Sequence, residues 1–208
     1  MQTEWASENL QIIRTLMERS AVYRHALAPV MATIGLTGIG AAIMEAFARM
    51  RTSGTFAAYW MIVGVICLAE AFFLTRRQAV KENEPFWSPP TKRVAQALSP
   101  AFFAGFVAGL VFLRFDPGNP RGAWLLVPGW MVLYGCALHA AGFFMPRGIK
   151  LFGWGFIVTG CVLGVGALFY TGQPSLSMAN WAMGAFFGGS HWAYATYLFF
   201  TEKRRNAA

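Results

Sequence analysis

Charged residues are scarce in this sequence. Lys, Arg, Asp and Glu together make up 12% of the 208 residues, while hydrophobic residues make up 56%. Soluble globular domains devote roughly a quarter of their residues to charge. The composition therefore excludes an ordinary soluble domain and favours a single membrane domain that accounts for nearly the whole chain.

Signatures of known chemistry are also missing. The sequence has no nucleotide-binding or catalytic motif, and no HExxH or paired-histidine pattern that would fix the geometry of a metal site. The three cysteines, Cys67, Cys136 and Cys161, all lie inside apolar stretches. We interpret them as small packing residues rather than as a disulfide framework. We accordingly favour a protein that is not an enzyme.

Apolar stretches, in contrast, dominate the chain. A helix needs about 20 apolar residues to cross ~30 Å of hydrocarbon, and most of the stretches reach that length. The third is shorter and spans only if its helix begins near Val94. The sequence therefore predicts an all-α polytopic membrane protein, a bundle of six transmembrane helices within residues 24–201. The predicted spans cover residues 26–48, 56–74, 101–113, 124–145, 151–171 and 178–200.

The basic residues are distributed unevenly between the two ends of this bundle. Thirteen of the 17 Lys and Arg residues fall on the side of the termini, and four fall on the other side. By the positive-inside rule, both termini are predicted to be cytoplasmic, including the basic tail 202–208, and the protein to lie in the cell (inner or plasma) membrane. We attribute the basic excess to topology and to contact with anionic lipid head groups, and we do not expect nucleic-acid binding.

Two segments outside the spans carry patterns of their own. Residues 1–23 place apolar side chains at helical spacing, which predicts an amphipathic helix that anchors in the cytoplasmic interface or, alternatively, docks a partner. Residues 76–99 form the one sizeable cytoplasmic loop. Within it, Ser88 is predicted to cap a helix that starts at Pro89 and continues, with a kink, past Pro100.

Small-residue pairs in the spans indicate close helix packing. Glycines four residues apart lie on one face of a helix and let a neighbouring backbone approach. We interpret these pairs as contacts within the bundle, although they leave homo-oligomerisation open. The pairs are Gly105 with Gly109, Gly160 with Gly164, and Gly184 with Gly188.

Ionisable residues inside the spans are the best functional lead. A carboxylate in the middle of a spanning helix costs about 2.5 to 3.5 kcal/mol on insertion scales, so such a residue normally faces the bundle interior. From the helical rise, Glu70, His139 and His191 lie about 9, 12 and 15 Å inward of the cytoplasmic surface. They sit at related depths on helices that run in the same direction, so they are candidates to converge.

Convergence would suit two kinds of site. With Tyr134 and Tyr194, the three residues would line a cleft that binds or passes a small ligand, a proton or a cation. Alternatively, Glu70, His139 and His191 match the ligand set of a non-haem metal site, and two histidines from separate helices match haem ligation. Cys67 and Cys136 share those helix faces and would add a soft ligand.

Two further interpretations stay open. Glu70 would pair with a histidine or with Arg24 and fix helix register, while His191 donates a hydrogen bond across the glycine face of the last helix. Separately, the short loops, the aromatic surface and the amphipathic N-terminal segment suit an accessory or scaffold subunit that docks beside a larger membrane complex. The leading hypothesis remains a non-enzymatic membrane protein with a polar intramembrane cleft, and a metal- or haem-binding redox or sensory protein is the alternative.

Overall fold

The computed structural model describes most of the chain. The predicted amphipathic helix over residues 1–23 lies outside the described part, as do residues 207–208 of the tail. The described residues are 26–48, 52–83, 85–145, 147–172 and 175–206.

All regular structure in these residues is helical, as predicted. Five helices are long and apolar enough to cross a membrane, which is the pattern of a multi-pass membrane protein. A sixth helical rod is formed by α6, η1 and α7, which follow one another without a break. The elements are the helix Ala26–Ala48, α2 (Ser53–Lys81), α3 (Pro89–Phe115), α4 (Pro120–Ala141), α5 (Arg147–Phe169), α6 (Leu176–Met183), the π-helix η1 (Gly184–Gly189) and α7 (Ser190–Asn206).

Local sequence explains where several helices begin. The side chains of Thr52, Asn119 and Ser175 each accept a hydrogen bond from a backbone N–H of the first turn of α2, α4 and α6. Ser88 occupies the N-cap position of α3, as predicted, but its hydroxyl contacts Thr91 Oγ1 at 3.1 Å instead of a backbone N–H. The prolines that follow Ser88 and Asn119 need no N–H partner in a first helical turn.

The structure corrects the predicted loop over residues 76–99. The second span continues as helix to Lys81, and the next helix starts at Pro89, so only a short turn separates α2 from α3. The Arg76–Lys81 segment consists largely of good helix formers and prolongs α2 into a polar extension. Because α3 runs through Pro100 to Phe115, the third apolar stretch gains the length that the sequence alone had left short.

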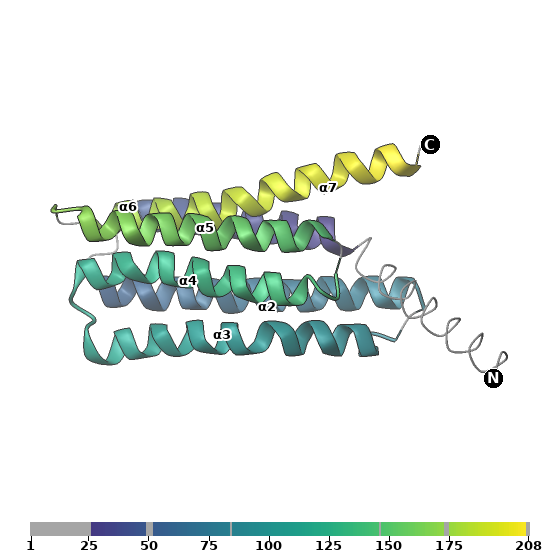
Figure 1. Cartoon of the computed structure of the whole chain (residues 1–208), viewed down its shortest axis with the longest axis horizontal. Helices are drawn as coiled ribbons and strands as arrows, with labels where there is room; N and C mark the ends of the chain where they lie inside the picture. The colour runs from purple at the N-terminus through teal and green to yellow at the C-terminus, as the bar shows by residue number, and fades with distance from the viewer. Residues whose placement is uncertain (1–25, 49–51, 84, 146, 173–174, 207–208) are drawn as a thin grey trace, which may run out of the picture.

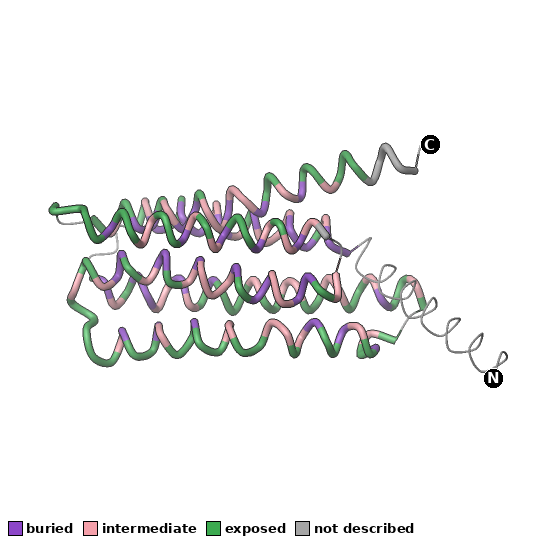
Figure 2. The backbone as a smooth tube through the Cα atoms, in the orientation of Figure 1, coloured by how far each residue is buried: buried purple, intermediate pink, exposed green. Residues whose placement is uncertain are grey.

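The helices form an up-and-down bundle. Figure 1 shows α2, α3, α4 and α5 as long rods joined by turns at alternate ends, with the C-terminus at the same end as the α2–α3 turn. Buried residues line the sides on which helices face one another, and exposed residues cover the outer sides (Figure 2). The outer sides are strongly apolar: Phe103, Leu151 and Phe169 are 70%, 74% and 80% exposed.

Glycines allow the closest helix contacts, all within the chain. A Cβ at Gly188 would lie 2.6 Å from the backbone nitrogen of Ile39, and one at Gly38 would lie 2.9 Å from the Cα atom of Gly188. The helix Ala26–Ala48 therefore crosses η1 backbone to backbone. The other predicted pairs behave alike, since Gly105 and Gly109 face Trp130 and Gly160 faces α4. The interpretation of these glycines as packing sites within the bundle is confirmed.

Candidate functional site

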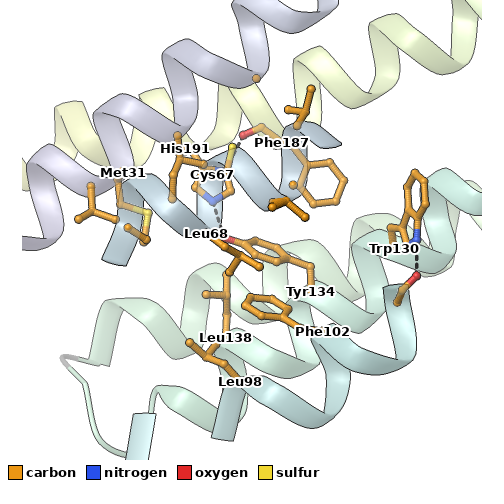
Figure 3. A pocket seen from close by; sticks show the side chains of 18 of the residues that line it. Met31, Cys67, Leu68, Leu98, Phe102, Trp130, Tyr134, Leu138, Phe187 and His191 are labelled. Carbon is orange, nitrogen blue, oxygen red and sulfur yellow. Dashed lines mark hydrogen bonds between the residues drawn. The ribbon is translucent and has the colours of Figure 1, made fainter. Parts of the chain in front are cut away.

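A cavity of about 350 Å³ opens between the helices. Its walls come from the helix Ala26–Ala48, α2, α3, α4 and the last helical rod, and they are mainly aliphatic and aromatic (Figure 3). Sites for small organic ligands are typically apolar hollows of roughly 300–1,000 Å³ with a few placed polar groups. In size and lining, this cavity belongs to that class.

The polar centre of the cavity is the pair Tyr134 and His191. Both line the cavity, and the Tyr134 hydroxyl lies 2.6 Å from Nε2 of His191 (Figure 3). The other ring nitrogen, Nδ1, contacts the backbone carbonyl of Phe187. A carbonyl only accepts, so Nδ1 carries the proton and Nε2 accepts from the tyrosine. A second ring proton would place an unpaired charge in a fully buried apolar cage, so His191 is neutral, and both of its ring nitrogens are engaged by the protein.

The π-helical turn η1 positions this pair. Phe187 lies in η1 and His191 in the first turn of α7, so the imidazole bonds a carbonyl four residues back along the same rod. Isolated π turns within α-helices frequently occur at functional sites. Gly188 and Gly189 have no side chain, which lets the backbone of this turn pack against the helix Ala26–Ala48 at Gly188.

Aromatic rings enclose the histidine. Phe152 meets the His191 ring edge-on at 5.1 Å between centroids, and Phe156 lies at 5.7 Å. Phe102 of α3 stacks on Tyr134 at 5.9 Å. His191 is fully buried, so it is held in one orientation by rings and two hydrogen bonds.

Further polar groups line the cavity on α2 and α4. The Trp130 indole N–H donates to the Gly105 carbonyl over 2.9 Å, and the Thr75 hydroxyl donates to the Ala71 carbonyl over 2.7 Å. Cys67 is half-buried and lines the cavity, whereas Cys136 and Cys161 are exposed on the outer surface. The interpretation of all three cysteines as packing residues is therefore wrong for the latter two.

Glu70 lies away from the cavity lining. Its Oε1 atom accepts a hydrogen bond of 2.7 Å from the Thr37 hydroxyl, which links α2 to the helix Ala26–Ala48. Its Oε2 atom is buried with no hydrogen-bond partner among the described residues. The predicted partner Arg24 lies outside those residues.

His139 and Tyr194 also have surroundings of their own. The His139 ring packs edge-on against Phe143 and Trp154, each at 5.6 Å, and its Nδ1 has no hydrogen-bond partner in the described part of the chain. Tyr194 stacks on Phe152 at 4.6 Å, and Phe152 is also the ring that meets His191 edge-on.

The structure thus brings together Tyr134 and His191 but not the predicted metal ligands. Among the described residues, no three His, Cys, Asp or Glu side chains gather closely enough to hold a metal ion. Glu70, His139 and His191 therefore do not assemble as one ligand set. His191 has no free nitrogen lone pair to offer a metal or haem iron, because Nε2 accepts from Tyr134 and Nδ1 bears the proton.

Comparison with known proteins adds no relative. The chain matches no protein-family model, no curated protein and no solved structure. The site therefore has to be interpreted from its own chemistry.

Sequence reasoning missed two groups that shape the site. Thr37 is the hydrogen-bond partner of Glu70, and its hydroxyl at mid-span is the sequence signal that could identify it. The Phe187 carbonyl fixes the His191 tautomer, and no sequence signal identifies a backbone acceptor of this kind.

Proposed function

We propose that this chain is a multi-pass membrane protein that binds a small, neutral, largely apolar molecule inside the bundle. The observation that carries the proposal is the cavity of about 350 Å³ with the Tyr134–His191 pair at its polar centre. Among the described residues, the lining contains no Asp, Glu, Lys or Arg side chain, which disfavours a cation or a charged solute as the occupant.

Length and charge support the proposed placement in the membrane. With the rod α6–η1–α7 as the proposed sixth span beside the five long apolar helices, both termini would lie on one side of the membrane. The end of α2 and the start of α3 expose a cluster of basic side chains that suits the cytoplasmic face of a cell membrane and its anionic head groups. The cluster consists of Arg76, Arg77, Lys81, Lys92 and Arg93.

Ligand entry from the lipid is consistent with the exposure of the cavity walls. Val65 and Leu68 on α2 and Phe106 on α3 line the cavity and are 54%, 48% and 44% exposed. An apolar molecule that has partitioned into the bilayer would enter between α2 and α3 without crossing a polar surface.

The test is occupancy of the cavity by a defined probe. We choose 4-fluoro-1-naphthol, whose ¹⁹F NMR resonance distinguishes protein-bound from lipid-partitioned molecules, with the protein in lipid nanodiscs. Cys67→Trp fills the cavity and should abolish the bound resonance, whereas Cys136→Trp places the same ring on the outer surface and should keep it. Ala101→Phe, which fills the cavity from α3, provides a second blocking variant. Equal binding by wild type and both blocking variants would refute the proposal.

A further inference from the structure

Donor groups in the cavity wall are already in use by the protein. The N–H of Trp130 is bonded to the Gly105 carbonyl, and the O–H of Thr75 is bonded to the Ala71 carbonyl. Neither group has a second proton to offer to a ligand.

The Tyr134–His191 pair uses its protons in the same way. The Phe187 carbonyl takes the Nδ1 proton, so Nε2 has only a lone pair, and the Tyr134 proton must point at that lone pair. The Phe187 carbonyl can only accept, so it fixes the direction of both hydrogen bonds. Reversing the Tyr134–His191 bond would need a proton on Nε2, with Nδ1 then facing the carbonyl lone pairs or the ring doubly protonated in an apolar cage.

Two weaker donors remain in the lining. The indole N–H of Trp60 has no hydrogen-bond partner among the described residues, but the nitrogen is buried under neighbouring atoms and is not exposed to the cavity. The Cys67 thiol is a weak donor. Within the described part of the chain, a ligand that enters this cavity therefore meets no strong unpaired donor.

An acceptor, in contrast, is left over at the polar centre. The Tyr134 oxygen has two lone pairs, and within the described part of the chain its hydrogen bonding is limited to the proton that it gives to His191. Donating that proton strengthens the oxygen as an acceptor, because hydrogen bonds in a chain polarise one another.

We infer that the cavity selects an apolar molecule that carries a hydroxyl or amine N–H, and that the Tyr134 oxygen accepts this proton. The inference deepens the proposed function and rests on it, because it names the ligand's polar group. A ketone or ether of the same shape buries its oxygen, which is a hydrogen-bond acceptor, with no donor in the cavity wall to pair with it. It therefore binds more weakly than the donor-bearing molecule. One neutral hydrogen bond corresponds to a preference of roughly tenfold for the donor-bearing molecule.

A matched pair of probes tests this preference. We compare 4-fluoro-1-naphthol with its methyl ether, 4-fluoro-1-methoxynaphthalene, by ¹⁹F NMR in nanodiscs, and correct each for partition into protein-free nanodiscs. Wild type should bind the naphthol roughly tenfold more tightly than the ether. Tyr134→Phe removes the phenol oxygen but frees the Nε2 lone pair of His191, so the deciding variant is Tyr134→Phe/His191→Leu, which removes both acceptors and should bind the two probes equally. A purely steric penalty on the methoxy group would persist in that variant.

A second comparison needs no variant and keeps the inference testable if Tyr134→Phe/His191→Leu does not fold. Wild type should prefer 1-amino-4-fluoronaphthalene to its N,N-dimethyl derivative by a similar factor. Equal binding within both pairs, with loss of binding in Cys67→Trp, would overturn the donor inference and leave the proposed function standing. Absence of binding by every probe would overturn both the donor inference and the proposed function. A preference for the ether that is lost in Trp60→Phe would also overturn the donor inference, and it would identify the indole of Trp60 as the recognising group.

Discussion

The Tyr134 hydroxyl and Nε2 of His191 lie 2.6 Å apart, so one hydrogen bond joins α4 to α7 across the cavity. The bond continues through the imidazole to the Phe187 carbonyl in η1. A tyrosine, a histidine and a backbone carbonyl thus form a single chain inside an otherwise apolar bundle. Each group in this series of hydrogen bonds is paired with its neighbour, so removing one group leaves the next without a partner. The coupling energy between Tyr134 and His191 can therefore be measured.

Removing the hydroxyl should destabilise the fold. Tyr134→Phe leaves the fully buried Nε2 of His191 without a donor, and such a group costs about 1–3 kcal/mol. His191→Leu removes the same bond from the other side. The free energy of unfolding of each variant and of the double variant is measured in mixed detergent–SDS micelles. The double-mutant cycle should give a coupling energy of about 1 kcal/mol. Strictly additive effects would show that the two side chains do not bond.

The contact between the helix Ala26–Ala48 and η1 should tolerate no side chain. In Gly188→Ala the new Cβ meets backbone atoms at Ile39 and Gly38, so the helices must separate, and we expect a loss of about 1–3 kcal/mol. Gly40→Ala is the matched control, because a Cβ there meets nothing within 4 Å. The control should be neutral, or stabilising by up to about 1 kcal/mol through helix propensity. Thermal denaturation in detergent compares them, and equal effects at both positions would contradict the backbone contact.

Glu70 should act through Thr37. Thr37→Val keeps the shape of the side chain but removes the donor to Oε1, and interhelical hydrogen bonds of this kind contribute about 1 kcal/mol in membrane proteins. Thr37→Ser keeps the hydroxyl and should retain most of the stability. Equilibrium unfolding in mixed micelles distinguishes the two. A Thr37→Val variant as stable as wild type would show that the bond to Glu70 contributes nothing to stability.

Much of the helical framework was predictable because long apolar runs determine it. The first predicted span, residues 26–48, is helical throughout, and the passage of α3 through Pro100 follows from a helix start near Pro89. The π turn was not predictable. It depends on how Gly188 meets the helix Ala26–Ala48, which is a tertiary contact with no periodic signature in the sequence.

The site was predictable in depth but not in direction. Helical rise predicts related levels for Glu70, His139 and His191, and of these the structure joins His191 to another predicted site residue, Tyr134. His139 lies five residues after Tyr134, which turns it by about 140° around α4, away from the cavity and against Trp154. Packing sets the rotation of each helix about its axis. The sequence therefore predicts how deep a residue lies in the membrane, but not which residue on another helix it faces.

Topology gives the last prediction, and it follows from charge. In a background without the three native cysteines, Lys81→Cys lies at the exposed end of α2 and Arg121→Cys at the exposed start of α4, on opposite ends of the bundle. Because most basic residues share the end that contains Lys81, the positive-inside rule places that end in the cytoplasm. A membrane-impermeant maleimide should therefore label Arg121→Cys in intact cells, and Lys81→Cys only after the membrane is opened. The reverse pattern would invert the orientation. Labelling of both sites in intact cells would show that the helices between them do not separate two compartments.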